Sequence, residues 1–172
     1  NTTYSFVSGE TKMPIHLSAA LSGRSVPAGG TFKGICDKYN DTYQFTILNR
    51  YYIQPTAFFS IVDLYNFVDD KNRLDVSNTE IEIIEPALVN YVAKMPMTSN
   101  YYIQATNDAT PAQTSALCIS LTSRNETFSA QAGDSIKGLK GYYSKLAVVD
   151  GIYQGSMFHI PEVNFNNLEL IN

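Results

Sequence analysis

Residues 101–106 read Tyr-Tyr-Ile-Gln-Ala-Thr, and residues 51–56 read Tyr-Tyr-Ile-Gln-Pro-Thr, so one pattern occurs twice. Tyrosine and isoleucine are enriched in strands, and alternation with a period of two is typical of a strand with one buried face. Repeat arrays show similarity along most of each repeat, whereas little similarity flanks these two copies. We favour reuse of good strand residues over a duplicated β-unit, which stays the alternative.

Similar strand signals continue on both sides of the two copies. Turn clusters rich in glycine, serine and asparagine separate them, which favours a sandwich or barrel. We therefore predict a mainly β protein, a single β-rich domain over residues 1–172, folded as an antiparallel β-sandwich of the jelly-roll or immunoglobulin-like kind. The further strand segments are residues 2–7, 12–21, 31–36, 42–48, 79–84, 117–122, 127–130, 146–149 and 156–160.

The region 57–95 leaves room for one or two short helices. Residues 56–69 carry apolar side chains at helical spacing after Thr56, a potential N-cap, although their β-branched and aromatic content also favours a strand. Residues 86–95 begin with Pro86 at the first helical position and are the second candidate helix.

Composition excludes several classes of protein. Of the 172 residues, 44% are hydrophobic and only 16% are charged, which is typical of a globular chain rather than a disordered one. The net charge is −4 and cations are not clustered, so we expect no nucleic-acid partner. No stretch reaches the ~18 consecutive apolar residues of a membrane helix, so we expect no membrane insertion.

The two cysteines, Cys36 and Cys118, stand in apolar contexts. Free cysteine packs as a small hydrophobic residue, so we expect two buried thiols. One disulfide between them is the alternative.

The sequence holds no recognisable catalytic motif. It lacks Gly-x-Ser-x-Gly, a phosphate-binding loop and Cys-x-x-Cys, and its two histidines, His16 and His159, are far apart. Residues 69–75 alternate oxygen ligands with cations, which favours a solvated turn over a calcium loop. We predict no enzyme, no metal and no cofactor; a hydrolase without a visible motif is the remaining alternative.

Adjacent tyrosines are the most suggestive feature for binding. Neighbouring residues in a strand point to opposite faces, and Ile53 and Ile103 share a face with the first tyrosine of each pair. Because isoleucine is usually buried, Tyr51 and Tyr101 should point inward. The predicted outward-facing binding residues are Tyr52, Tyr102, Gln54 and Gln104.

Three functions fit these features. The first is a structural or assembly module, such as a virion capsid or tail component or a pilus-type subunit, whose partners are copies of itself or other structural subunits. The second is a glycan- or receptor-binding module, and the third is the hydrolase. The low charge and the many Asn, Thr and Tyr residues favour an extracellular, cell-surface or virion location.

Overall fold

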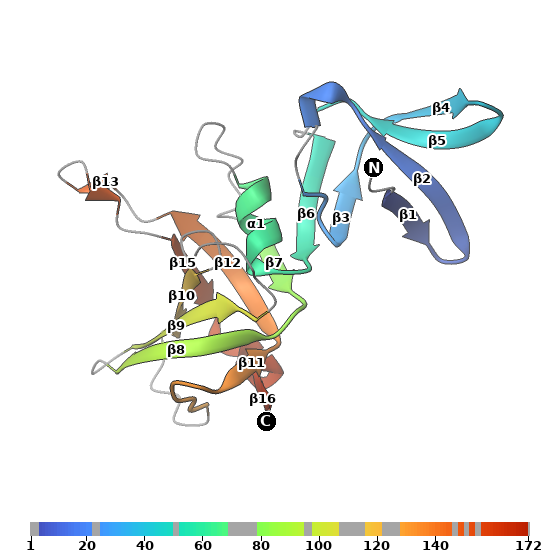
Figure 1. Cartoon of the computed structure of the whole chain (residues 1–172). Helices are drawn as coiled ribbons and strands as arrows, with labels where there is room; N and C mark the ends of the chain where they lie inside the picture. Colours follow the sequence, from blue (N-terminus) through green and yellow to red (C-terminus); the bar gives the residue numbers. More distant parts are fainter. Residues whose placement is uncertain are drawn as a thin grey trace.

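The structure is a computed structural model that describes residues 4–21, 25–49, 52–68, 79–94, 98–106, 116–121, 128–145, 148–149, 152–153 and 156–171. Strands make up most of these residues, so the prediction of a mainly β protein is confirmed. The described strands form a four-stranded sheet, a ten-stranded sheet and a separate pair of short strands. Figure 1 shows the smaller sheet standing to one side of the larger one.

The four-stranded sheet has the order β1-β2-β5-β4 and consists of two hairpins that lie side by side. Asn40 and Asp41 close the second hairpin with φ values of 46 and 64, which are the left-handed values of a type I′ turn. β2 and β5 run parallel where the hairpins meet. The strands are β1 (Tyr4–Ser8), β2 (Thr11–Leu17), β4 (Ile35–Tyr39) and β5 (Thr42–Ile47), and the short 3-10 helix η1 (Ala19–Leu21) follows β2.

The ten-stranded sheet has the order β16-β11-β8-β9-β10-β15-β12-β7-β6-β3. The pairs β6·β7 and β10·β15 run parallel, so the sheet is mixed and the prediction of an antiparallel fold is not confirmed. Helix α1 (Ile61–Phe67) follows β6 and helps to return the chain, so that β7 runs in the same direction. The strands are β3 (Gly29–Phe32), β6 (Ile53–Phe58), β7 (Glu80–Ile83), β8 (Ala87–Lys94), β9 (Ser99–Ala105), β10 (Ala116–Leu121), β11 (Ser135–Lys137), β12 (Leu139–Lys145), β15 (Ser156–Ile160) and β16 (Glu169–Ile171), while β13 (Val148–Val149) pairs with β14 (Ile152–Tyr153).

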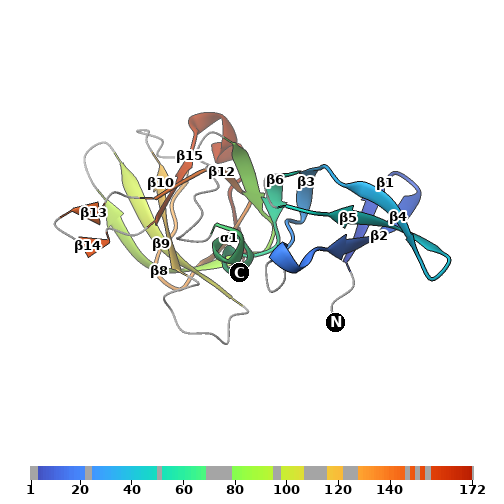
Figure 2. The same ribbon diagram turned by 90° about the horizontal axis from the view of Figure 1, so that it is seen from above.

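The large sheet curls around α1. Phe67 of α1 packs on Phe58 of β6 with 5.4 Å between ring centroids. Tyr65 of α1 packs edge-on against Tyr143 of β12 at 6.2 Å and donates a hydrogen bond to the carbonyl of Ala116 at the start of β10. These strands are not neighbours in the sheet, so a helix that touches all three requires a half-barrel, as Figure 2 shows from above. A two-sheet sandwich is not confirmed.

Helix α1 lies within the first predicted helix but is shorter. Thr56 belongs to β6 and does not cap the helix; instead, the hydroxyl of Ser60 accepts a hydrogen bond of 3.1 Å from the backbone N–H of Asp63. Residues 53–58 pair with β3 and β7 as strand β6, so the helix can begin only after them.

The second predicted helix is wrong, because residues 87–94 form β8. Ala87 and Val89 are buried, as strand alternation requires, but the register with β9 shifts between Val89 and Tyr91. This β-bulge makes Val92, three residues after Val89, the next inward side chain. The helix was predicted because Leu88, Tyr91 and Val92 would share one helical face, but in the strand Tyr91 faces outward and Val92 packs against the core.

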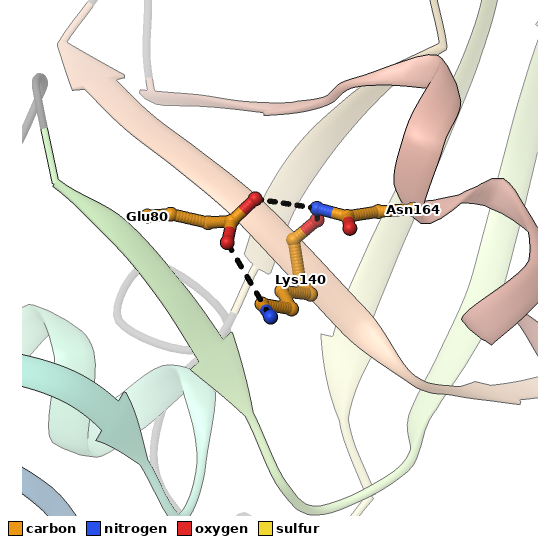
Figure 3. Close-up of polar contacts among 3 residues, drawn as sticks. All are labelled: Glu80, Lys140 and Asn164. Carbon is orange, nitrogen blue, oxygen red and sulfur yellow. Dashed lines mark hydrogen bonds and ion pairs between the residues drawn. The ribbon is translucent and has the colours of Figure 1, made fainter.

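The outer side of the curl carries a buried polar contact in the 3-10 helix η3 (Glu162–Asn167), shown in Figure 3. The side-chain amide of Asn164 donates to Glu80 Oε1 at 2.6 Å and to the carbonyl of Lys140 at 3.1 Å. Glu80 also pairs with the ammonium of Lys140 at 3.4 Å. These contacts hold η3 against β7 and β12, and we assign them a structural role.

The contrast between Tyr101 and Tyr102 gives a test of the strand register. Tyr101 is 1% exposed and packs edge-on against Phe128, whereas Tyr102 is 44% exposed. Tyr101→Ala should lower the free energy of unfolding by about 3–5 kcal/mol, because it empties a large buried volume. Tyr102→Ala, the matched control, should cost less than ~1 kcal/mol. Urea unfolding measures both, and equal losses would contradict the register.

Candidate binding surface

The structure places Tyr102 and Gln104 on β9, Gln54 on β6 and Tyr52 directly before β6. Tyr52 is 46% exposed and Tyr102 is 44% exposed, and Gln54 is exposed while Gln104 is half-buried. Ile53 and Ile103 are buried as predicted. The prediction that Tyr101 points inward is confirmed, and Tyr51 lies outside the described residues.

These four residues do not form one site. Tyr102 and Gln104 lie on β9, whereas Gln54 lies on β6 and Tyr52 directly precedes it. Four strands separate β6 from β9 in the sheet order, namely β10, β15, β12 and β7. The two copies of the pattern also have different partners, since β9 pairs antiparallel on both sides and β6 pairs parallel with β7. This difference favours reuse of strand residues over a duplicated unit.

Around Tyr102 of β9, side chains from neighbouring strands form a row across the large sheet. Tyr91 of β8 stands opposite Tyr102 with 5.8 Å between ring centroids and an interplanar angle of 42°. Cys118 of β10 stands opposite Tyr102 on its other side, and Met157 of β15 stands opposite Cys118. We call Tyr91, Tyr102, Cys118 and Met157 the tyrosine row.

Two side-chain amides border this row. The amide of Asn90, the bulge residue of β8, donates to Gln104 Oε1 at 3.1 Å. This bond leaves Asn90 Oδ1 and the Gln104 amino group available beside the rings of Tyr91 and Tyr102. Leu88 and Ala116, which are both uncharged, stand opposite Gln104 on the two neighbouring strands.

Two neighbouring side chains of the row, Tyr102 and Cys118, have raised pKa values. Burial raises the pKa of the Cys118 thiol, and a hydrogen bond with Tyr102 offsets only part of this effect. The Cys118 thiolate and burial in turn raise the pKa of Tyr102. The surface therefore offers aromatic rings and the hydrogen-bonding groups of two side-chain amides.

The remaining candidates for chemistry stay apart. His16 lies on β2 of the small sheet and His159 on β15 of the large one. Residues 69–75 lie outside the described part of the chain. Within the described residues, no three His, Cys, Asp or Glu side chains come together to hold a metal ion, and no helix is long and apolar enough to span a membrane.

Sequence reasoning missed Tyr91, Asn90 and Cys118 as parts of this surface. Tyr91 and Asn90 fell within the predicted helix, and Cys118 was expected in the core, whereas its side chain is half-buried on the outer face. The strand alternation of residues 117–121 contained the signal for Cys118, since Leu117 and Ile119 are the buried positions. The expectation of a buried Cys36 is also wrong, because every residue of β4 is exposed, and both cysteines are free.

Comparison with known proteins gives no relative: no family model matches the chain, and neither a curated protein nor a solved structure is significantly similar to it.

The different surroundings of the two thiols predict their reactivity. Cys36 is exposed, whereas Cys118 is half-buried and has a raised pKa, so less of its thiolate is present at neutral pH. Iodoacetamide at pH 7.5 should therefore alkylate Cys36 well before Cys118, as measured by mass spectrometry of peptides over time. Equal or faster labelling of Cys118 would contradict the description of the tyrosine row.

Proposed function

We propose that the protein is a non-enzymatic structural or assembly module of an exposed surface structure, such as a virion capsid or tail component or a pilus-type subunit. The observation that carries the proposal is the apolar exposure of the small sheet. Val7, Ile35, Tyr39 and Tyr43 are 62%, 54%, 66% and 63% exposed, respectively.

The arrangement of these side chains supports a contact surface. Single exposed apolar residues are ordinary on proteins. Here Val7, Ile35 and Tyr39 share one face of a four-stranded sheet, according to its strand register. β1 and β4, which carry them, are the two edge strands, whose unpaired backbone groups can accept a strand from another chain. Val7 borders one edge of the sheet and Ile35 and Tyr39 border the other, so exposed apolar side chains stand beside the unpaired backbone groups at each edge.

Composition supports the rest of the proposal. With 16% charged residues and a net charge of −4, the chain lacks the clustered cations that a nucleic-acid partner requires. We therefore propose copies of this chain or other structural subunits as partners, and an extracellular, cell-surface or virion location.

Self-association is the first test of an assembly module. Size-exclusion chromatography with light scattering, run over a hundredfold range of protein concentration, should give a mass that rises above the 19.1 kDa of one chain. Association would cover exposed apolar side chains at an edge of the small sheet. A strictly monomeric protein at every concentration would argue against assembly with copies of itself.

A second candidate function is glycan binding at the tyrosine row. Tyr91 and Tyr102 offer apolar ring faces at low entropic cost, and the paired amides of Asn90 and Gln104 can bond to hydroxyl groups. A sugar ring combines an apolar face with neutral hydroxyls, so it matches this surface in both respects.

A glycan array followed by titration tests this second function with a matched control. Tyr102→Ala should weaken binding of any glycan detected by about tenfold or more, because a stacking ring is removed. Tyr52→Ala removes an equally exposed tyrosine far away in the sheet order and should leave binding unchanged. Equal effects of both changes, or no glycan bound, would remove the tyrosine row as a glycan site.

A further inference from the structure

The two edge strands of the small sheet differ in which backbone groups they leave free. Tyr39 and Thr42 flank the turn of the second hairpin, so they form a hydrogen-bonded pair. Hydrogen-bonded and non-hydrogen-bonded pairs alternate along an antiparallel ladder. The N–H and C=O groups of Lys38 and Cys36 therefore point away from β5, toward the free edge of β4.

The free edge of β4 is protected against strand addition. The backbone N–H of Lys38 donates to the carboxylate of its neighbour Asp37 at 2.7 Å, so this outward donor is already occupied. The Lys38 ammonium pairs with Asp41 at 2.8 Å. Charged side chains on an edge strand discourage the approach of another strand.

β1 has no such protection. Ser8 and Thr11 flank the turn of the first hairpin, so by the same alternation Ser5 and Val7 direct their N–H and C=O groups toward the free edge. Pro14 stands opposite Ser5, where its missing N–H costs no hydrogen bond to β1. Both Ser5 and Val7 are exposed, and β1 contains no charged residue and no proline.

The edges of the large sheet are less suitable. β3, one edge, carries a register irregularity between Gly29 and Gly30, and β16, the other edge, is three residues long. Bulges and short length are both means by which edge strands avoid pairing. Among these four edges, β1 is the open one.

We propose that β1 pairs antiparallel with β1 of a second copy of this chain, so that two small sheets become one continuous sheet. This inference rests on the proposed assembly function and specifies its contact. A twofold axis perpendicular to the sheet places Phe6 opposite its own copy and Ser5 opposite Val7 of the other chain. Ser5 and Val7 carry the outward groups, so each such pair exchanges two hydrogen bonds.

Three observations select a second copy as the occupant. β1 is uncharged, so two copies meet without repulsion. The central Phe6 forms a non-hydrogen-bonded pair, where side chains come closest, and it already packs with Phe32 and Phe45 at 6.1 and 6.5 Å. The protected β4 is a poor partner for β1, which disfavours head-to-tail chains. An isologous contact of this kind closes as a dimer.

The test compares two variants, each of which removes one outward backbone N–H, one from edge strand β1 and one from edge strand β4. Val7→Pro deletes a donor that the dimer uses and the monomer does not, so it should raise the dimer dissociation constant by about tenfold or more. Cys36→Pro makes the same change on β4 and should leave the dimer unchanged. Val7→Lys is the second variant, because an edge lysine blocks pairing without altering the backbone. Light scattering reports the mass, and circular dichroism confirms that each variant is folded.

Amide hydrogen exchange by NMR identifies the contact directly. In the dimer, the amides of Ser5 and Val7 should become protected as protein concentration rises, while that of Cys36 should not. Self-association that persists in both Val7 variants, with Ser5 and Val7 unprotected, would overturn the β1 contact and leave the assembly function standing. A monomer at all concentrations would overturn the β1 dimer and assembly with copies of this chain. Protection of β1 only after addition of a different protein would replace the second copy with another strand.

Discussion

The fold depends on one constraint, which is that the apolar face of the ten-stranded sheet must be covered. Ten strands about 4.8 Å apart span roughly 43 Å, whereas a seven-residue helix such as α1 is about 10 Å long. α1 is the only α-helix among the described residues, and one helix of this length cannot cover the sheet. The sheet therefore covers itself by curling, and Phe67 and Tyr65 of α1 fill the space between strands that are not neighbours.

The same constraint determines where binding can take place on the large sheet. Because the inner face is committed to the core, only outward positions remain available, and strand alternation selects them. The bulge at Asn90 then changes which residues of β8 face outward. Val89 is buried, and two residues later Tyr91 would also point inward in a regular strand. The inserted residue turns Tyr91 outward to meet Tyr102, so the tyrosine row exists because the ladder is irregular.

Local alternation allowed many strands to be predicted, including β5, β7, β9, β10 and β15, together with the inward direction of Tyr101. Pairing could not be predicted, because nothing local distinguishes a parallel partner from an antiparallel one. Residues 31–36, predicted as one strand, divide between two sheets at Gly34, where a side chain would meet the carbonyl of Thr46 at 2.4 Å. Part of the candidate site could be predicted from the sequence. The outward direction of Tyr102 and Gln104 followed from strand alternation, whereas that of Tyr91 depends on a bulge that local sequence does not reveal.

The four-stranded sheet is too small to cover its own inner face by curling, so other parts of the chain must cover that face. After β2 the chain leaves the small sheet and forms β3 at the edge of the large sheet. It then re-enters the small sheet as β4. Phe32 of β3 then packs edge-on against Phe6, and the backbone N–H of Lys33 bonds to the carbonyl of Tyr52 beside β6. β3 therefore links the two sheets: it pairs within the large sheet, but in the sequence it lies between β2 and β4 of the small sheet. The edge strand β1, which we propose as the dimer contact, is therefore linked to the large sheet through Phe6 and β3.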